Sequence, residues 1–398
     1  MYDFIIIGSG VAGCTIFKEL INKYPNKKIL LLEKGNSPKY ISEGNNKVQV
    51  LYVNSLGGSA LYSVGNAFKI DLRYMGISIK DDIYNEIENE LNVNLVPPNF
   101  INKPTQNLYN YGFKRTPKFI NFNKCRSCGM CASKLCNAKW TPRNLLLPKN
   151  SNGKIITNFE VLNIQKKERV FFVEGSYRTN KNNNKNNTNI NEKRIFKGKN
   201  VILSAGGINS PRILSSILDN EYIGKNLFVD TFITVGGVLN DANLNNSIPM
   251  SVYKKYDDFI LSPHYSTLLY NQIKEENKII KNSDIFGLMI KIKDDNNGIV
   301  GKNYVYKDIS KKDDELFSKG FKEALNIFSD MGIDKIYKTI PRGSHPSGTC
   351  AVGKVVNKDF ETEIDGLFVC DASIFPKPIG LPPILGIIAI GKKLSHIL

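Results

Sequence analysis

Runs of consecutive apolar residues are separated by more polar stretches in the first part of the chain. The first run is Phe4 to Ile7, a similar run covers Ile29 to Leu32, and a third lies within the stretch KNVILSA at residues 199–205. Unbroken apolar runs of this length are typical of strands buried on both faces of a parallel sheet. A helix of apolar and small residues is predicted over Val11 to Leu20, between the first two runs. A strand, a helix and a second strand in this order predict an α/β fold.

A different pattern, in which apolar and polar residues alternate, follows in the second half of the chain. It covers residues 231–239, 250–256 and 284–292, and it predicts strands of an antiparallel sheet. An amphipathic helix is predicted over Lys311 to Met331, with apolar residues every three to four positions. These elements predict a second domain of the α+β class.

A small antiparallel unit is predicted between these two parts. Residues 161–164 and 170–178 alternate like a pair of antiparallel strands. The stretch from Asn180 to Arg194 is rich in asparagine and lysine and has nothing to bury. We therefore predict a disordered loop at the tip of a hairpin, with no function of its own.

A glycine-rich turn joins the first predicted strand to the first helix. Gly8, Gly10 and Gly13 fit G-x-G-x-x-G, which allows a tight turn, close approach to a pyrophosphate and packing of helix on strand. The helix N-terminus favours phosphate. Glu33 ends the second strand twenty residues after Gly13, where a ribose hydroxyl needs a carboxylate. We predict a dinucleotide site; the alternative is a glycine turn in another kind of α/β protein.

Two further stretches offer backbone to a flat or charged ligand. Gly57 and Gly58 precede Ser59 in the segment LGGS. Ala205 and Gly206 follow a predicted buried strand and open a predicted helix. Both stretches are expected to contact the same cofactor.

Composition and charge set few further limits. The 398 residues are 41% hydrophobic and 23% charged, as in an ordinary soluble globular protein. The net charge of +17 comes from dispersed lysines without a motif that reads bases, so we do not expect nucleic-acid binding. An acidic lipid surface or an acidic electron-transfer partner is kept as an alternative.

The chain shows no sign of a membrane anchor or of export. No apolar run is long enough to span a bilayer, and residues 1–7 already form a predicted strand rather than a signal peptide. Four of the seven cysteines lie between positions 125 and 136, which is not the framework of a secreted disulfide protein. We therefore expect a cytoplasmic protein.

The motifs, in this order, resemble the glucose–methanol–choline (GMC) family of FAD-dependent oxidoreductases. The matching segments are GSGVAG at 8–13 with Glu33, LGGS at 56–59, AGGINSPRIL at 205–214, GKNL at 224–227, HPSGT at 345–349 and LFVCDASIFP at 367–376. The resemblance spans nearly the whole chain and implies FAD as the dinucleotide.

The resemblance also implies a division of the chain. A Rossmann-like FAD-binding domain, discontinuous in sequence, is expected from residues 1–75, 150–230 and 345–398. A helical segment with the cysteines covers residues 76–149. A substrate domain over residues 231–344 is expected to cover the flavin ring with its antiparallel sheet.

His345 matches the catalytic histidine of the family, and Asp371 and Ala372 match backbone that lies near the pyrophosphate and flavin. An alcohol becomes a carbonyl by losing its hydroxyl proton to a base and a hydride to the flavin. Histidine suits the base because its ordinary pKa lies near working pH. The alternative for His345 is a structural histidine that satisfies a turn.

One position departs from the family pattern. A second histidine or asparagine is usual just after Gly380, but Leu381 stands here and can neither donate nor accept a hydrogen bond. Either His345 works alone, or another polar group assists, for which Asn66 is a weak candidate, or the chemistry has changed.

Cys125, Cys128, Cys131 and Cys136 form a second distinctive motif. Their spacing, C-x2-C-x2-C-x4-C, is close to the ferredoxin run that binds an iron–sulfur cluster, although the last gap is one residue longer. Zinc sites more often split their ligands into two separated pairs. Some dehydrogenases resembling the family carry an iron–sulfur cluster at this place. We predict such a cluster, with zinc and with free or structural cysteines as alternatives.

The sequence therefore predicts an FAD-dependent dehydrogenase acting on the CH–OH group of an alcohol, polyol or sugar. His345 is the expected base, and the electrons are expected to pass through the cluster to a protein or quinone acceptor. The alternative is a non-oxidative or electron-transfer flavoprotein on the same fold, either lyase-like or an electron-carrying subunit. Leu381 and the small size of the chain favour that alternative.

Overall fold

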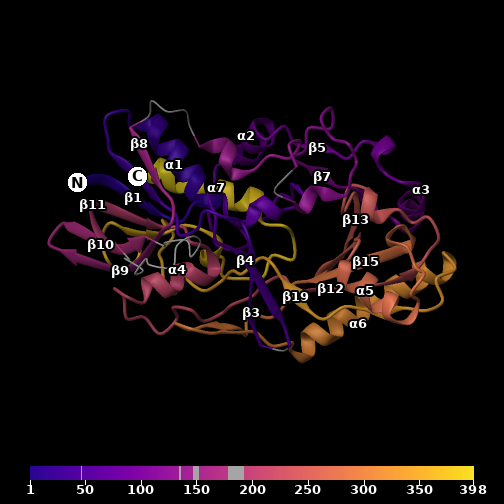
Figure 1. Ribbon diagram of the computed structural model, residues 1–398. Helices are drawn as coiled ribbons and strands as arrows, with labels where there is room; N and C mark the ends of the chain where they lie inside the picture. The colour runs from indigo at the N-terminus through magenta and orange to yellow at the C-terminus, as the bar shows by residue number, and fades with distance from the viewer. Residues whose placement is uncertain (46, 134–135, 147–151, 178–191) are drawn as a thin grey trace, which may run out of the picture.

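The computed structural model describes residues 1–45, 47–133, 136–146, 152–177 and 192–398. Within them, two large sheets lie side by side, and both chain termini lie at the first sheet (Figure 1). The predicted low-complexity loop falls mostly on residues 180–191, which lie outside the described part of the chain.

The first sheet contains the apolar runs of the sequence. Its strands are β1 (Tyr2–Ile7), β2 (Ile29–Leu32), β8 (Gly153–Ile156), β9 (Phe159–Lys167), β10 (Val170–Tyr177), β11 (Lys193–Leu203) and β20 (Leu367–Val369). The order is β8-β2-β1-β11-β10-β9, and β20 pairs with the second half of β11. Neighbours among β8, β2, β1, β11 and β20 run parallel, as in a Rossmann-like sheet. Phe4 to Ile7 are at most 4% exposed, so β1 is buried on both faces as predicted.

The predicted antiparallel strands belong to this same sheet. β9 and β10 pair antiparallel with each other, and β10 pairs antiparallel with the first half of β11. The alternating pattern therefore marks an antiparallel edge of the first sheet rather than a separate small unit.

Three helices accompany the first sheet. They are α1 (Val11–Lys23), α4 (Gly206–Leu214) and α7 (Ile384–Ile397), of which α1 and α7 lie side by side (Figure 1). α1 follows β1 and α4 follows β11, so both helices begin at the carboxyl ends of parallel strands. Open α/β sheets bind their ligands at this edge. The predicted α/β class with a Rossmann-like unit is confirmed.

The second sheet is mostly antiparallel. Its strands are β3 (Tyr40–Gly44), β4 (Gln49–Val53), β6 (Lys114–Arg115), β12 (Phe232–Val238), β13 (Val252–Lys255), β14 (Phe259–Pro263), β15 (Ile285–Ile292), β18 (Tyr337–Lys338) and β19 (Arg342–Gly343). The order is β3-β4-β19-β12-β15-β14-β13-β6, and β18 pairs with β12. β12, β13 and β15 are the three strands that the alternation predicted. β3 and β4, within residues 1–75, join this sheet through β19.

Two helices belong to the second sheet, α5 (Thr267–Glu276) and α6 (Lys311–Asp330). α6 coincides with the predicted amphipathic helix and starts at a capping box, in which Ser310 and Asp313 each bond the other's backbone N–H. Phe317 and Phe328 of α6 share a core with Phe286 of β15. This core packs α6 against the second sheet, while Ile260 of β14 and Met289 of β15 belong to the core of the first sheet.

The remaining elements are short. They are α2 (Ile83–Glu90), α3 (Lys103–Gln106), β5 (Asn94–Leu95) paired with β7 (Pro117–Lys118), and β16 (Ile299–Val300) paired with β17 (Val305–Tyr306). In the described part of residues 76–149, only α2 and α3 are α-helical, and turns and single-turn helices make up much of the rest.

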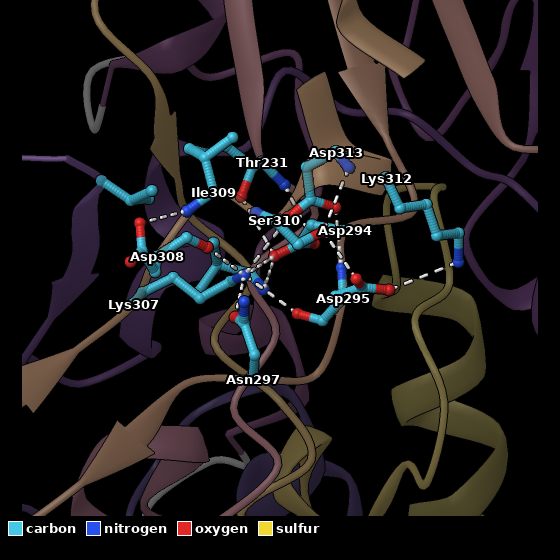
Figure 2. Close-up of polar contacts among 12 residues, drawn as sticks. Thr231, Asp294, Asp295, Asn297, Lys307, Asp308, Ile309, Ser310, Lys312 and Asp313 are labelled. Atoms are coloured by element: carbon cyan, nitrogen blue, oxygen red, sulfur yellow. Dashed lines mark hydrogen bonds and ion pairs between the residues drawn. The ribbon is translucent and has the colours of Figure 1, made fainter. Parts of the chain in front are cut away.

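A buried polar network holds the loops beside β12 and β15 (Figure 2). Asp294 Oδ2 accepts hydrogen bonds from the backbone N–H of Val229 at 3.1 Å and from Thr231 Oγ1 at 3.0 Å. Lys307 Nζ lies 3.2 Å from the same oxygen, and both side chains are fully buried. Lys307 also donates to the backbone oxygens of Asp295 and Asp308 and to Asn297 Oδ1. The network thereby fixes the backbone on both sides of Asp230.

Candidate cofactor and active site

A cavity of about 800 Å³ opens at the carboxyl edge of the first sheet and is closed from the other side by β3, β4 and the loop after β19. It is lined by most of the residues that the sequence singled out: Gly8, Gly10, Glu33, Gly58, Ser59, Ala205, Gly206, His345, Asp371 and Ala372. Gly13 and Gly57 lie just behind this lining. The cavity therefore brings together segments that are as much as 360 residues apart in the chain, such as those that begin at Gly8 and end at Ala372.

The three glycines of the first turn have separate structural roles. Gly8 has φ +100°, and a Cβ there would lie 2.4 Å from the backbone oxygen of Ser204. A Cβ on Gly13 would lie 1.9 Å from the backbone oxygen of Gly8, so this glycine lets α1 pack on β1. Gly10 has φ −69° and only one neighbour within 4 Å of an added Cβ. Gly10 therefore keeps space free beside the start of α1, where phosphate binds.

Glu33 lies at the end of β2 and is 6% exposed. Its Oε2 accepts hydrogen bonds from the backbone N–H and the hydroxyl of Ser9, at 3.0 and 2.6 Å, and its Oε1 accepts one from Gly35 N at 2.8 Å. The carboxylate thus braces the glycine turn and still borders the cavity.

The LGGS segment packs directly on the first turn. Gly57 N donates to the backbone oxygen of Ser9 at 3.0 Å. Gly58 has φ +59°, and a Cβ there would lie 3.0 Å from Gly10 Cα. These two turns form one continuous backbone surface along the cavity.

Asp371 anchors the start of α4. Its Oδ2 accepts hydrogen bonds from Gly206 N at 2.8 Å and Ser210 Oγ at 2.6 Å, and its Oδ1 accepts one from Ser373 N at 2.8 Å. A Cβ on Gly206 would meet nothing within 4 Å, so this backbone is open to the cavity. Asp371 therefore acts through the backbone that it holds.

The HPSGT loop lies against the Gly-Gly turn that opens α4. Thr349 Oγ1 donates to the backbone oxygen of Gly207 at 2.7 Å. A Cβ on Gly207 would lie 2.1 Å from the backbone oxygen of Pro346. This packing places His345 at the cavity wall.

His345 is part of a group of three charged or titratable side chains, of which Lys291 and Asp230 are buried and His345 is partly exposed. Its Nδ1 lies 2.7 Å from Lys291 Nζ and 3.1 Å from Asp230 Oδ2, and Lys291 Nζ lies 3.0 Å from the same oxygen. Asp230 Oδ1 accepts a hydrogen bond from Gly380 N at 2.7 Å. The side chains of Lys291 and Asp230 are 3% and 0% exposed. Nε2 of His345 has no hydrogen-bond partner among the described residues and is the ring nitrogen left for a substrate.

Burial shifts the ionisation of this group. It lowers the pKa of His345, a charge on Lys291 lowers that pKa further, and Asp230 opposes both effects. Burial raises the pKa of Asp230, but Lys291 and His345 outweigh it, so that the pKa is lowered overall. His345 is therefore a neutral imidazole and Asp230 a carboxylate at neutral pH.

Sequence reasoning missed Lys291 and Asp230. Lys291 is the one charged residue in the otherwise apolar strand β15, whose residues are all buried, and this was the available sequence signal. Asp230 follows the GKNL segment but has no motif of its own.

Leu381 and Asn66 lie away from the cavity. Leu381 is 9% exposed and borders a separate cavity of about 200 Å³, while Pro382 and Pro383 border the large one. Asn66 is buried, and its Oδ1 accepts a hydrogen bond from Lys118 Nζ at 2.6 Å. The polar groups nearest His345 are therefore Lys291 and Asp230 rather than Asn66.

Sequence reasoning also missed the polar rim of the cavity. Arg212 of α4 forms a two-pronged ion pair with Glu43 of β3, at 3.1 and 2.7 Å, and Glu43 also bonds the hydroxyl of Tyr52. All three side chains border the cavity. This pair ties the β3–β4 hairpin to the FAD side of the site.

The four clustered cysteines lie in the segment between β7 and β8. Cys131 is buried, Cys125 and Cys136 are half-buried, and Cys128 is exposed. Burial, together with the neighbouring Cys136 and Cys125, raises the pKa of Cys131 to about 11 against the effect of Lys118, so the thiols share one neighbourhood. Within the described residues, however, no three His, Cys, Asp or Glu side chains are arranged to hold a metal ion. Thiols are suitable donors for a cluster, but their arrangement in the described residues does not form a metal site.

Two buried lysines lie beside these cysteines. Lys139 Nζ donates to the backbone oxygen of Cys131 at 2.7 Å and to those of Leu61 and Ser63. Burial lowers the pKa of Lys118 to about 7 and that of Lys139 to about 8, and the neighbouring cysteines oppose both shifts. The segment is thus locally basic and tied to the turn after the LGGS motif.

Comparison with known proteins gives the family. Two models described as GMC oxidoreductase match the chain, one over residues 72–232 and the other over residues 293–391. The chain belongs to the GMC oxidoreductase family. It is 48% identical to the uncharacterized protein MJ1450 of Methanocaldococcus jannaschii, over 99% of this chain and 98% of that protein.

Solved structures share the fold of this GMC oxidoreductase. Pyridoxine 4-oxidase from Mesorbium loti has a TM-score of 0.74 at 14% identity, covering 100% of this chain and 99% of that one. A formate oxidase variant from Aspergillus oryzae has a TM-score of 0.72 at 13% identity, covering 100% and 97%. Identities this low show the fold alone.

The residues of the GMC oxidoreductase fit FAD. The open space beside Gly10, the uncapped start of α1 and the length of the cavity from Glu33 to His345 suit an extended dinucleotide. The protein is an FAD-dependent oxidoreductase of this family. No helix in the described part of the chain is both long and apolar enough to cross a bilayer.

Proposed function

We propose that this GMC oxidoreductase is a dehydrogenase that oxidises the CH–OH group of an alcohol, polyol or sugar, with His345 as the base. The observation that carries the proposal is the place of His345 at the wall of the cavity, where Lys291 and Asp230 contact Nδ1 and Nε2 has no partner among the described residues. A neutral histidine can accept a proton, and its ordinary pKa matches the working pH.

Each part of the site has one task in this proposal. FAD, when bound, supplies the hydride acceptor. The glycine turns at Gly10 and Gly58 hold the dinucleotide through backbone, because no side chains fill that space. His345 Nε2 takes the hydroxyl proton. Arg212 and Glu43 at the rim hold β3 and β4 over the site and limit the entry of water.

The test is anaerobic reduction of the bound flavin by a panel of alcohols, polyols and sugars. The reduction is measured as the loss of the visible absorption of the flavin. The wild-type protein is expected to bleach with at least one donor. His345→Gln is expected to keep FAD and to slow bleaching about 10²- to 10⁴-fold. His396→Gln is the matched control, because this exposed residue of α7 does not border the cavity.

Other outcomes separate the alternatives. Bound FAD that no donor bleaches, but that dithionite reduces, would favour a non-oxidative or electron-transfer flavoprotein, as the apolar Leu381 position suggests. Rapid formation of hydrogen peroxide in air would indicate an oxidase rather than a dehydrogenase with a protein or quinone acceptor.

We also propose that Cys125, Cys128, Cys131 and Cys136 hold an iron–sulfur cluster. The spacing and the shared neighbourhood of the thiols support it, and binding would require the segment to bring the thiols closer together than they lie in the described residues. Such a cluster accepts single electrons. The test is iron and sulfide content per FAD, with EPR after dithionite, on protein purified without air. Cys128→Ser and Cys131→Ser are expected to lose the iron, the sulfide and the EPR signal, whereas Cys350→Ser, outside the four-cysteine segment, is the control.

The free cysteines support a reducing compartment for the protein. All seven lie in the described part of the chain and none is in a disulfide. We therefore propose a cytoplasmic location.

A further inference from the structure

Lys291 is a buried lysine that contacts His345, and the function proposed above gives it no role. Lys291 lies on β15, 2.7 Å from Nδ1 of His345 and 3.0 Å from Asp230 Oδ2. Charged lysines are almost never fully buried unless they are paired, and this one is paired with a carboxylate and a ring nitrogen. Lys291 is therefore placed to exchange a proton with Nδ1 of the His345 ring.

We propose that Lys291 is a positioning residue that exchanges a proton with Nδ1 of His345, so that the imidazole relays the substrate's hydroxyl proton from Nε2 to the Lys291 amine. The proposal rests on the proposed function for the origin of that proton. In this proposal, Lys291 and Asp230 are the polar groups near the base, because Leu381 stands where the family usually has a histidine or asparagine.

The proton transfer balances in four bond changes. The substrate O–H bond breaks and an Nε2–H bond forms, while the Nδ1–H bond breaks and an Nζ–H bond forms on Lys291. The hydride goes to FAD, the oxidant of the proposed function. The imidazole is neutral before and after, and the new ammonium lies beside the Asp230 carboxylate. The Asp230 carboxylate, 3.0 Å from Lys291 Nζ, stabilises the ammonium that forms.

The relay requires Lys291 to exist as an amine before the reaction. Burial lowers the pKa of Lys291, against the attraction of Asp230 and Asp294. The charged groups around Lys291 and His345 are Asp230 and Asp294 in the adjoining loops, and Lys307 and Asp313 behind Asp294. Lys293 follows directly after the end of β15, and Arg342 of β19 lies across from Phe232. The Asp294 charge is already paired with Lys307, which leaves Asp230 as the main counter-charge of Lys291.

The tautomer of His345 reports the state of Lys291. An ammonium on Lys291 must donate to Nδ1, which places the imidazole proton on Nε2. An amine on Lys291 leaves Nδ1 protonated, hydrogen-bonded to Lys291 or Asp230, and gives Nε2 the free lone pair that a base needs.

The experiment is ¹⁵N NMR of the FAD-loaded protein labelled at histidine. The chain has three histidines, and the signals missing in His345→Gln identify those of His345. We expect His345 to stay neutral over the pH range and to move its proton from Nε2 at low pH to Nδ1 at high pH. A wild-type His345 that titrates to imidazolium like an ordinary histidine, without a change of tautomer, would overturn the proposal.

Two variants test the same exchange in opposite directions. Lys291→Met removes the amine, so His345 is expected to keep its proton on Nδ1 and to titrate as an ordinary imidazole beside Asp230. Lys291→Arg keeps a cation that cannot lose its proton, so His345 is expected to stay protonated on Nε2. An unchanged tautomer response in both folded variants would contradict the relay. If neither variant folds, the wild-type titration alone decides.

Flavin reduction separates this inference from the proposed function. With an active donor, the rate is expected to rise with pH in the wild type and to fall at least 10²-fold in Lys291→Arg at every pH. Reduction without the tautomer change would leave the proposed function standing and reject the relay. A tautomer change without flavin reduction by any alcohol would support the proton exchange and reject the proposed function.

Discussion

At the scale of single residues, the cofactor site depends on glycine backbone that is not covered by side chains. Gly8 and Gly13 are fixed by close backbone contacts, whereas Gly10 has ordinary φ and free space around it. Substitutions at these positions are therefore expected to have different effects. Change at Gly8 disturbs the fold, and change at Gly10 takes up the space of the cofactor.

Gly10→Val tests this difference. The added side chain occupies the space beside the start of α1, so FAD content is expected to fall by at least tenfold while the apoprotein stays folded. The measurement is the ratio of flavin to protein absorption after purification with added FAD, together with thermal unfolding of the apoprotein. Gly8→Val is the comparison, because φ +100° and a contact of 2.4 Å predict loss of folded protein. FAD retained in full by Gly10→Val would contradict the assigned position of the pyrophosphate.

The residues that the sequence revealed are those whose role depends on local geometry. Glycines in a turn and His345 in HPSGT are recognisable because the constraint lies within a few residues. Lys291 and Asp230 are 61 positions apart and meet only through the pairing of β12 with β15. A lysine in an apolar strand was a visible sign, but its partner depends on tertiary structure that no single segment encodes.

At the scale of elements, loops rather than strands hold Asp230, the partner of His345, in place. Asp294 bonds the backbone on both sides of Asp230 and pairs with Lys307, and all of these groups are buried (Figure 2). The loop after β15 is therefore a structural support for the site.

Asp294→Asn is expected to lower the free energy of unfolding by about 3–5 kcal/mol, because it leaves the buried Lys307 without its closest carboxylate. Asp295→Asn is the matched control. Its side chain is partly exposed and pairs with Lys312 at 3.4 Å, so a loss of at most about 1 kcal/mol is expected. Chemical denaturation of both variants gives the comparison. Equal losses would mean that the network contributes no more than a surface ion pair.

The sequence pattern recovered the elements with strong periodicity. Apolar runs predicted β1, β2 and the second half of β11, and helical spacing predicted α6. It did not reveal that β3 and β4 pair into the second sheet, because five-residue strands with a half-exposed face have little pattern of their own. The spacing of the cysteines likewise did not predict how they are arranged, because spacing fixes the order of the ligands along the chain but not the path of the loop.

At the scale of the whole molecule, the large positive charge makes stability depend on the carboxylates. The formal net charge is +17 at pH 7. Hydrogen bonds from Arg212 lower the pKa of Glu43, and hydrogen bonds from Lys199 lower the pKa of Asp3. Each lowered pKa stabilises the fold at pH values above the unfolded pKa, about 4, and this contribution is lost as pH falls through the folded value.

The melting temperature is therefore expected to fall steadily below about pH 5, as carboxylates lose their charge and the repulsion between cations grows. Added salt is expected to reduce the fall, because it screens repulsion between exposed charges. Thermal unfolding followed by circular dichroism at several pH values and two salt concentrations is the measurement. A melting temperature that stays constant down to about pH 3 would contradict this dependence on paired carboxylates.

The most direct test of the account as a whole is the visible spectrum of the purified protein under anaerobic titration with alcohols, polyols and sugars. The account predicts a flavin spectrum from bound FAD, bleached by at least one donor in the wild type and in His396→Gln, and not within the same time in His345→Gln. A protein that binds no FAD when supplied with it, or whose flavin bleaches equally fast without the imidazole of His345, would contradict the account.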